Sequence, residues 1–174
     1  LPNTLSVVRI ILVPFILWFL IQDLFVISAI TISIVGLTDF FDGYLARKYN
    51  LTSQIGEILD PIADKILIVF VLFGLSVNLT SYFIAFIASV IITREIWVGA
   101  LRDLNARKGR SDVTKVTFLA KIKTSVQLFT ISIYLLGLTL NNMLLILFGD
   151  MFLFLSLLIT IYTGYIYSYN SFKN

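Results

Sequence analysis

Six long apolar stretches, separated by short polar breaks, dominate the sequence and limit the folds open to it. Each stretch approaches the roughly 20 apolar residues that an α-helix needs to cross a bilayer. Their expected limits are residues 6–21, 25–42, 56–77, 81–101, 118–138 and 143–167. Hydrophobic residues make up 59% of the chain and charged residues only 13%, which excludes an ordinary soluble domain. The pattern predicts an all-α integral membrane protein with six transmembrane helices, built as a single domain over residues 1–174.

The basic residues are distributed unevenly between the breaks. Three breaks contain no Lys or Arg, at residues 22–24, 78–80 and 140–142. Basic residues lie in the alternate breaks, at Arg47, Lys48 and throughout 102–117. Because cytoplasmic loops carry the excess of Lys and Arg in membrane proteins, we expect both termini and the 102–117 segment in the cytoplasm. A net charge of only +3 does not indicate a nucleic-acid-binding protein.

Asp150 interrupts the sixth apolar stretch. We expect the helix to begin near Asp150, with residues 144–148 at the membrane interface. A start at Met151 still leaves enough apolar length to span a bilayer. The alternative is that one acidic side chain lies shallowly within the membrane.

The chain contains neither Cys nor His. Their absence excludes disulfides, zinc sites with thiolate or imidazole ligands, and Ser-His-Asp or Cys-His catalysis. A metal ion would have to be bound by oxygen, which suits hard cations such as Mg²⁺ or Mn²⁺. A general base would have to be a carboxylate, Lys or Tyr.

Four aspartates form the most informative group in the sequence. Asp39 and Asp42 are spaced i, i+3, and Asp60 and Asp64 are spaced i, i+4, so each pair shares one helix face. The second and third apolar stretches run antiparallel through a short loop, which places both pairs at a similar depth. Four carboxylates at a membrane boundary repel one another unless positive charge offsets them. We interpret the group as a site for divalent cations suited to displacement at phosphorus; solvated helix ends beside basic loops are the alternative.

The spacing of these aspartates resembles a known signature. The pattern DxxDGxxAR, eight residues, GxxxDxxxD is met at every fixed position. The fixed positions are Asp39, Asp42, Gly43, Ala46, Arg47, Gly56, Asp60 and Asp64. The pattern is similar to that of the CDP-alcohol phosphatidyltransferases, which are membrane enzymes of six transmembrane helices that make phospholipid head groups.

The resemblance implies two Mg²⁺ or Mn²⁺ ions in one active site. Their expected ligands are Asp39, Asp42, Asp60 and Asp64, and Asp64 is also the expected general base. The expected binding residues for CDP-diacylglycerol are Asp39, Asp42, Gly43, Ala46, Arg47 and Gly56. The resemblance further implies a homodimer in the inner membrane of a bacterium, with the active site facing the cytoplasm.

Further similarity indicates which alcohol accepts the phosphatidyl group. Segments 1–5, 94–96 and 121–124 resemble the bacterial family members that use glycerol 3-phosphate and release phosphatidylglycerophosphate and CMP. Two positions depart from their pattern: Ala120 stands where Gly is common, and Ile166 replaces an acid in the segment 163–167. A phosphorylated acceptor needs cationic groups besides the metals. The residues expected to bind its phosphate are Arg94, Arg102, Lys121, Lys123 and Thr4.

Arg94 and Arg102 are eight residues apart, two turns along nearly the same helix face. An Arg within a membrane needs a partner. Glu95 follows Arg94 directly, and we expect it to point elsewhere on the helix.

The sequence is also compatible with two other functions. In the first, the acceptor is another alcohol, such as phosphatidylglycerol, which would make the protein a cardiolipin synthase. The second is a small cation transporter whose acids bind the transported ion, although no broken helix pair or inverted repeat suggests a site at the membrane midplane. A requirement for a water-soluble phosphorylated glycerol distinguishes the glycerol 3-phosphate acceptor from the first alternative.

Overall fold

The structure is a computed structural model that describes the backbone of residues 2–49, 54–110 and 118–173. Within these ranges, it describes the side chains of residues 7–38, 62–110, 119 and 122–173. The described chain forms six α-helices and no strand. They are α1 (Pro2–Ile21), α2 (Phe25–Tyr49), α3 (Gln54–Asn78), α4 (Tyr82–Arg107), α5 (Phe118–Thr139) and α6 (Met143–Phe172). Each helix overlaps one predicted apolar stretch, and α2, α4 and α6 continue past its expected end, so the all-helical prediction is confirmed.

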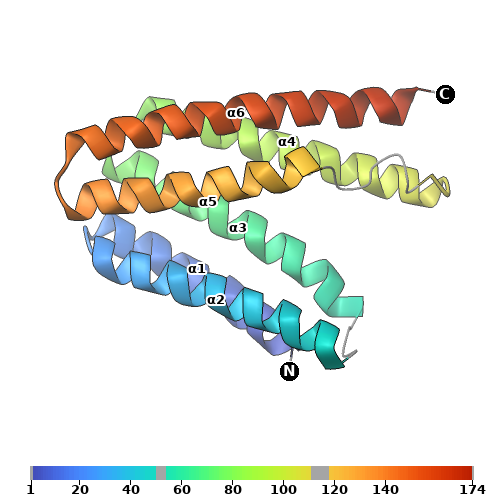
Figure 1. Cartoon of the computed structure of the whole chain (residues 1–174), viewed down its shortest axis with the longest axis horizontal. Coiled ribbons are helices and arrows are strands. Elements are labelled where there is room, and N and C mark those ends of the chain that lie inside the picture. The colour runs from blue at the N-terminus through green and yellow to red at the C-terminus, as the bar shows by residue number, and fades with distance from the viewer. Residues whose placement is uncertain (1, 50–53, 111–117, 174) are drawn as a thin grey trace.

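Three turns of one type join the helices in pairs (Figure 1). Each turn contains a residue with positive φ: Asp23 at 59°, Thr80 at 49° and Asn141 at 49°. The next residue donates its N–H to a carbonyl five residues earlier, as Ser81 does to Ser76 at 2.9 Å. This pattern satisfies carbonyls that the helix end leaves without partners. The three hairpins α1–α2, α3–α4 and α5–α6 turn at one end of the bundle, and both chain termini lie at the other end (Figure 1).

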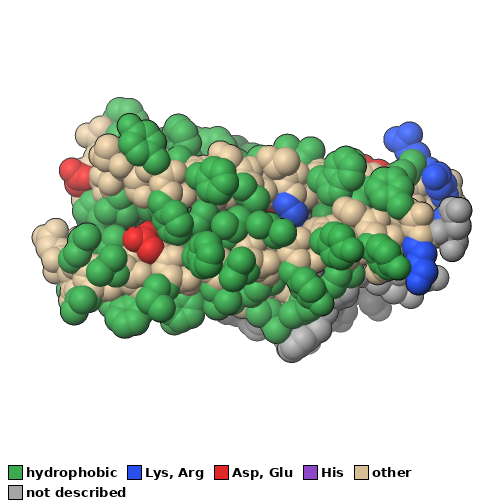
Figure 2. All heavy atoms as spheres, turned by 90° about the horizontal axis from the view of Figure 1, so that it is seen from above, with side chains coloured by type: hydrophobic (Ala, Val, Ile, Leu, Met, Phe, Trp, Pro, Cys, Tyr) green, Lys and Arg blue, Asp and Glu red, His purple; other side chains and the backbone are tan. Residues whose placement is uncertain are grey.

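The surface is largely apolar. Figure 2 shows hydrophobic side chains over most of one face, with several Lys and Arg side chains gathered at the end that holds the C-terminus. Among the described residues, three helical segments are long and apolar enough to cross a membrane: Tyr82–Arg107, Ile122–Thr139 and Met143–Phe172. Val7–Ile21 and Phe25–Thr38 are shorter apolar helices. The number of spans and their orientation stay predictions.

The helices pack as a closed ring. α1 packs on α2 and α3, α4 on α3 and α6, and α5 on α2 and α6, while α3 also contacts α5. Ile16 and Leu20 of α1 and Val71 and Leu75 of α3 are fully buried in the same apolar core. Gly74 permits the close approach of these two helices, since a Cβ there would lie 2.8 Å from Leu20 Cδ1. Small residues at such contacts let helix backbones approach closely inside a membrane, where apolar burial alone provides little driving force.

The prediction that the sixth helix begins near Asp150 is wrong. α6 begins at Met143, where the Asn142 side chain caps it by accepting from the N–H groups of Leu144 and Leu145. Asp150 therefore lies two turns inside the helix, and its Oδ1 accepts a hydrogen bond of 2.6 Å from the buried Tyr134 hydroxyl of α5. The sequence pattern missed this start because a partner on another helix, invisible in the local sequence, makes the acid tolerable inside α6.

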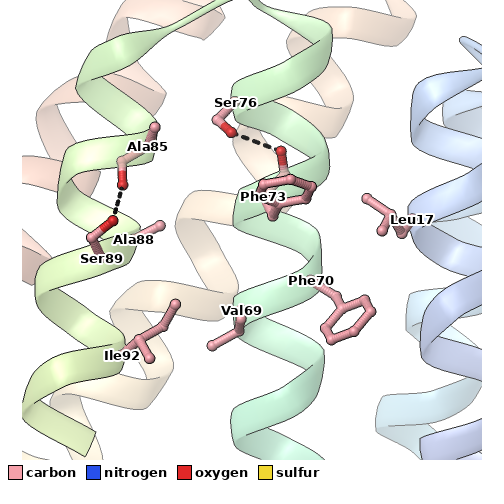
Figure 3. A pocket seen from close by; sticks show the side chains of 9 residues that line it. All are labelled: Leu17, Val69, Phe70, Phe73, Ser76, Ala85, Ala88, Ser89 and Ile92. Atoms are coloured by element: carbon pink, nitrogen blue, oxygen red, sulfur yellow. Dashed lines mark hydrogen bonds between the residues drawn. The ribbon is translucent and has the colours of Figure 1, made fainter.

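An apolar pocket of about 350 Å³ lies between α1, α3 and α4 (Figure 3). Leu17, Phe70 and Phe73 line it together with the hydroxyl-bearing Ser76 and Ser89. Both hydroxyls donate to carbonyls of their own helices, Ser76 to Phe73 and Ser89 to Ala85. Since its polar groups are used within the helices, this pocket offers little to bind a charged substrate.

Candidate active site

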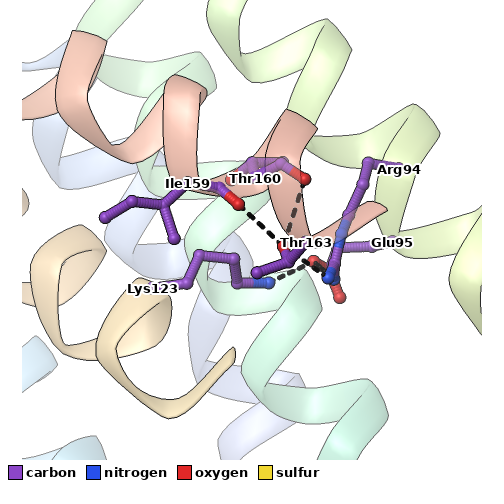
Figure 4. Close-up of polar contacts among 6 residues, drawn as sticks. All are labelled: Arg94, Glu95, Lys123, Ile159, Thr160 and Thr163. Atoms are coloured by element: carbon purple, nitrogen blue, oxygen red, sulfur yellow. Dashed lines mark hydrogen bonds and ion pairs between the residues drawn. The ribbon is translucent and has the colours of Figure 1, made fainter. Parts of the chain in front are cut away.

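Arg94 lies between α4 and α6 and is 9% exposed. Its Nη2 donates to Thr163 Oγ1 on α6 at 2.9 Å, and its Nη1 donates to Glu95 Oε1 at 2.8 Å (Figure 4). The expectation that Glu95 points away from Arg94 is therefore wrong. Adjacent residues start from different directions on a helix, but both of these side chains are long enough for their tips to meet beside α4.

Glu95 Oε1 also accepts a hydrogen bond from Lys123 Nζ on α5 (Figure 4). Lys123 is buried, with 7% of its side chain exposed, and the Glu95 side chain is 17% exposed. A carboxylate and an ammonium group in such surroundings each need a partner of opposite charge, because burial removes the water that would otherwise stabilise them. The pair therefore connects α4 to α5.

Tyr167 of α6 brings Arg94 and Arg102 together. The guanidinium carbon of Arg94 lies 5.6 Å from the Tyr167 ring centroid, and that of Arg102 lies 5.5 Å from it. Both distances fall within the range of cation–π attraction. Gly164 makes room for this arrangement, since a Cβ at that position would lie 3.1 Å from Arg94 Cγ. The two arginines thus share one face of α4, at the level where α6 covers it.

We refer to Arg94, Arg102 and Lys123, with Glu95 between them, as the basic cluster. Three cations against one carboxylate leave a net charge of +2 in these four residues. The Nε atoms of Arg94 and Arg102 are buried and donate to no protein group in the described part of the chain. Buried donors normally have partners, so the cluster has capacity for an anion.

A second charged pair lies on α1 and α3. Arg9 Nη1 donates to Asp64 Oδ1 at 3.2 Å, and Arg9 is 2% exposed, whereas 49% of the Asp64 side chain is exposed. The half-exposed carboxylate is reachable by ligands, while the buried guanidinium offsets part of its negative charge. Asp64 is therefore held by α1, while about half of its side chain stays exposed.

Several predicted site residues have side chains outside the described residues. They are Thr4, Asp39, Asp42, Gly43, Ala46, Arg47, Gly56, Asp60 and Lys121. Their backbones belong to α1, α2, α3 and α5. Among the side chains that the structure does describe, no three acidic groups gather into a metal site. The four-aspartate site therefore stays a prediction, with Asp64 as its one described member.

Comparison with known proteins places the chain in a family. The sequence model described as CDP-alcohol phosphatidyltransferase matches residues 1–162. The chain belongs to the CDP-alcohol phosphatidyltransferase family. Its membership and its long apolar helices together indicate an integral membrane protein.

Relatives within the CDP-alcohol phosphatidyltransferase family match over most of their length. One from Rickettsia bellii is 39% identical over 171 residues, covering 96% of this chain and 92% of the relative. One from Wigglesworthia glossinidia brevipalpis is 38% identical, covering 75% and 73%. One from Salmonella choleraesuis is 33% identical, covering 75% and 74%. Each of the three is named CDP-diacylglycerol–glycerol-3-phosphate 3-phosphatidyltransferase.

Several partners at the site were not predicted from the sequence. Glu95 and Thr163 accept hydrogen bonds from Arg94, and Tyr167 lies against both Arg94 and Arg102. Lys123 pairs with Glu95, and Arg9 pairs with Asp64. A signal was available for Arg9, because a cation inside an apolar helix requires an acid nearby. The sequence of the segment 163–167 gives no indication that it faces Arg94.

Proposed function

We propose that this protein transfers the phosphatidyl group from CDP-diacylglycerol to glycerol 3-phosphate, giving phosphatidylglycerophosphate and CMP in phospholipid biosynthesis. Family membership and the names of the relatives support the reaction. The observation that carries the choice of acceptor is the basic cluster, whose net charge of +2 matches a dianionic phosphate. An acceptor without a phosphate would leave this buried positive charge without a counterion.

In this proposal, Arg94, Arg102 and Lys123 bind the acceptor phosphate, and Lys121 and Thr4 complete the pocket. Arg94 Nε and Arg102 Nε are the donors that the protein itself leaves without acceptors in the described residues. A guanidinium group binds phosphate through several N–H groups at once, so two arginines fix both the position and the orientation of the acceptor.

Asp64 accepts the proton from the sn-1 hydroxyl of glycerol 3-phosphate. The oxygen then bonds to the phosphorus of the phosphatidyl group, the bond from this phosphorus to the oxygen of the CMP moiety breaks, and CMP leaves with the electron pair. Arg9 holds Asp64 in place through its contact at 3.2 Å. Gly43, Ala46, Arg47 and Gly56 bind the cytidine diphosphate part of the donor.

The donor set fits divalent cations, since only hard oxygen ligands are available and Asp64 is half-exposed. Asp39, Asp42, Asp60 and Asp64 would hold two Mg²⁺ or Mn²⁺ ions. When bound, such ions supply positive charge that stabilises the developing charge on the phosphate oxygens.

The proposed setting is the bacterial inner membrane. We further propose six spans with both termini in the cytoplasm and a homodimeric assembly. Both proposals rest on the resemblance in sequence. The acyl chains of the donor remain in the bilayer while the nucleotide and the acceptor come from the cytosol, so the reaction belongs where helix ends meet the cytoplasmic head groups. The placement of both termini at one end of the bundle supports this topology (Figure 1).

The test is purified protein with CDP-diacylglycerol, with CMP release followed as glycerol 3-phosphate is added or withheld. We expect release only with glycerol 3-phosphate, and its loss with a chelator and recovery with Mg²⁺ or Mn²⁺. Release with phosphatidylglycerol in place of glycerol 3-phosphate would identify a cardiolipin synthase instead. Cation flux through proteoliposomes without CMP release would identify a transporter.

A further inference from the structure

One oxygen atom, Glu95 Oε1, accepts from both Arg94 Nη1 and Lys123 Nζ. Two nitrogens that donate hydrogen bonds to the same oxygen lie at most about 6 Å apart, which is the sum of two hydrogen-bond lengths. One phosphate group, with its oxygens arranged as a tetrahedron, can bind donors at that separation. Glu95 thus sets the spacing between a cation of α4 and a cation of α5.

Arg94 and Lys123 would not stay this close without the carboxylate. Both are more than nine-tenths buried, and like charges in such surroundings repel strongly. Among the described residues, α4 and α5 do not pack on each other directly; both pack on α3 and α6, which place the two backbones but not the tips of these long side chains. The position of Lys123 relative to Arg94 therefore depends on Glu95.

The carboxylate leaves donors available for a ligand. Lys123 Nζ carries three N–H groups, and its one described acceptor is Glu95. Arg94 donates to Glu95 through Nη1 and to Thr163 through Nη2, while its Nε is buried without a partner. An anion can thus bind both cations while Glu95 keeps its place.

We propose that Glu95 is a positioning residue for the acceptor phosphate: its carboxylate holds Arg94 and Lys123 at the separation at which one phosphate binds both. This inference rests on the proposed function, since it concerns the same phosphate. Glu95 also sets the charge of the basic cluster, because its removal changes the net charge from +2 to +3.

The experiment compares Glu95→Ala and Glu95→Gln with the wild type. Glu95→Ala removes both hydrogen bonds, and we expect the KM for glycerol 3-phosphate to rise about tenfold or more. The KM for CDP-diacylglycerol and kcat at saturating acceptor should stay within about threefold, as expected when an interaction made equally in ground and transition states is lost. The amide oxygen of Glu95→Gln still accepts from both cations, so its KM for glycerol 3-phosphate should lie between those of the wild type and Glu95→Ala.

Ser171→Ala is the matched control. It removes a hydrogen bond of 2.9 Å between α4 and α6, donated by Asn105 Nδ2, and does not touch the basic cluster. We expect it to leave the KM for glycerol 3-phosphate unchanged. A second measurement needs no turnover: glycerol 3-phosphate alone should raise the thermal midpoint of the wild type and of Ser171→Ala, but not of Glu95→Ala.

The inference would be overturned if Glu95→Ala raised the KM values of CDP-diacylglycerol and glycerol 3-phosphate equally. It would also be overturned if Ser171→Ala raised the KM for glycerol 3-phosphate as much as Glu95→Ala does. If Glu95→Ala fails to fold, Glu95→Asp takes its place, because its shorter side chain cannot accept from both cations, and a wild-type KM for glycerol 3-phosphate in that variant would overturn the inference. A wild-type protein that releases CMP without glycerol 3-phosphate would instead refute the proposed function, so the two failures are distinguishable.

Discussion

Thr163→Val removes one hydroxyl group from the surroundings of Arg94 and keeps the shape of the side chain. Thr163 Oγ1 accepts from Arg94 Nη2 at 2.9 Å and donates to the carbonyl of Ile159, one turn earlier, at 2.7 Å. The Ile159 carbonyl lies within α6 and accepts a backbone N–H of the helix. Losing the Thr163 hydroxyl at this carbonyl therefore costs little free energy. The loss at Arg94 is the larger effect, because a buried guanidinium N–H is left without an acceptor.

The magnitude follows from the charge and burial of Arg94. Hydrogen bonds to charged groups contribute about 1.5–3 kcal/mol, whereas those between membrane helices average about 0.6 kcal/mol and reach about 1.7 kcal/mol. A charged donor at 9% exposure belongs at the upper end of the membrane range, near 1.5 kcal/mol by the same scale. If all of this loss appears in acceptor binding, the KM for glycerol 3-phosphate rises by at most about tenfold.

Thr160→Val is a matched control on the same helix. Thr160 is fully buried, and its Oγ1 has no hydrogen-bond partner among the described residues, although its backbone carbonyl receives a weaker contact from Thr163 (Figure 4). Removing this hydroxyl leaves no donor without its acceptor. We therefore expect the KM for glycerol 3-phosphate to stay within about twofold of the wild-type value.

The assay measures CMP release at varied glycerol 3-phosphate, together with thermal midpoints in detergent. Thr163→Val should lower the midpoint and raise the acceptor KM, while Thr160→Val should do neither. Equal behaviour of the two variants would refute the reasoning, because it would mean that the bond to Arg94 contributes no more than a hydroxyl without a partner.

Three further predictions concern catalysis and stability. Asp64→Asn should reduce turnover at least about 100-fold while donor binding survives in part; unchanged CMP release would remove Asp64 from the role of base. Thr80→Gly should raise the free energy of unfolding by about 1 kcal/mol in a denaturation assay, because a branched side chain at φ 49° is strained; a loss of stability would contradict this. Gly149→Ala should lower that free energy by about 1–3 kcal/mol, since its Cβ would lie 2.8 Å from Tyr134 Cε1. Gly36→Ala is the control for it, as nothing lies within 4 Å of that Cβ, and equal losses in both would argue against overpacking.

Much of the helical architecture was predictable from the sequence, because the apolar stretches have the length of membrane-crossing helices and their breaks are short. The start of α6 could not be predicted from the sequence, because a charged residue in an apolar stretch indicates a helix boundary unless its partner is known. Tyr134 supplies that partner from α5, sixteen residues away in sequence.

The candidate site divides in the same way. The spacing of Arg94 and Arg102 predicted a shared helix face, and Tyr167 contacts both of them. The neighbours of that face could not be predicted, because α6 and α5 approach α4 through packing between segments far apart in sequence. The position of Glu95 could not be predicted for this reason: local geometry gives the direction in which a side chain starts, while the cations around it decide where its tip lies.

By itself, the sequence determined the residue chemistry: apolar helices, oxygen ligands without thiol or imidazole, and aspartates in helical register. These properties depend on residue type and on spacing along one helix. Only the tertiary structure decided which charges meet, as Arg9 meets Asp64 and Glu95 meets Lys123. A buried charge takes its partner from whichever helix packs beside it, and that choice depends on the whole bundle.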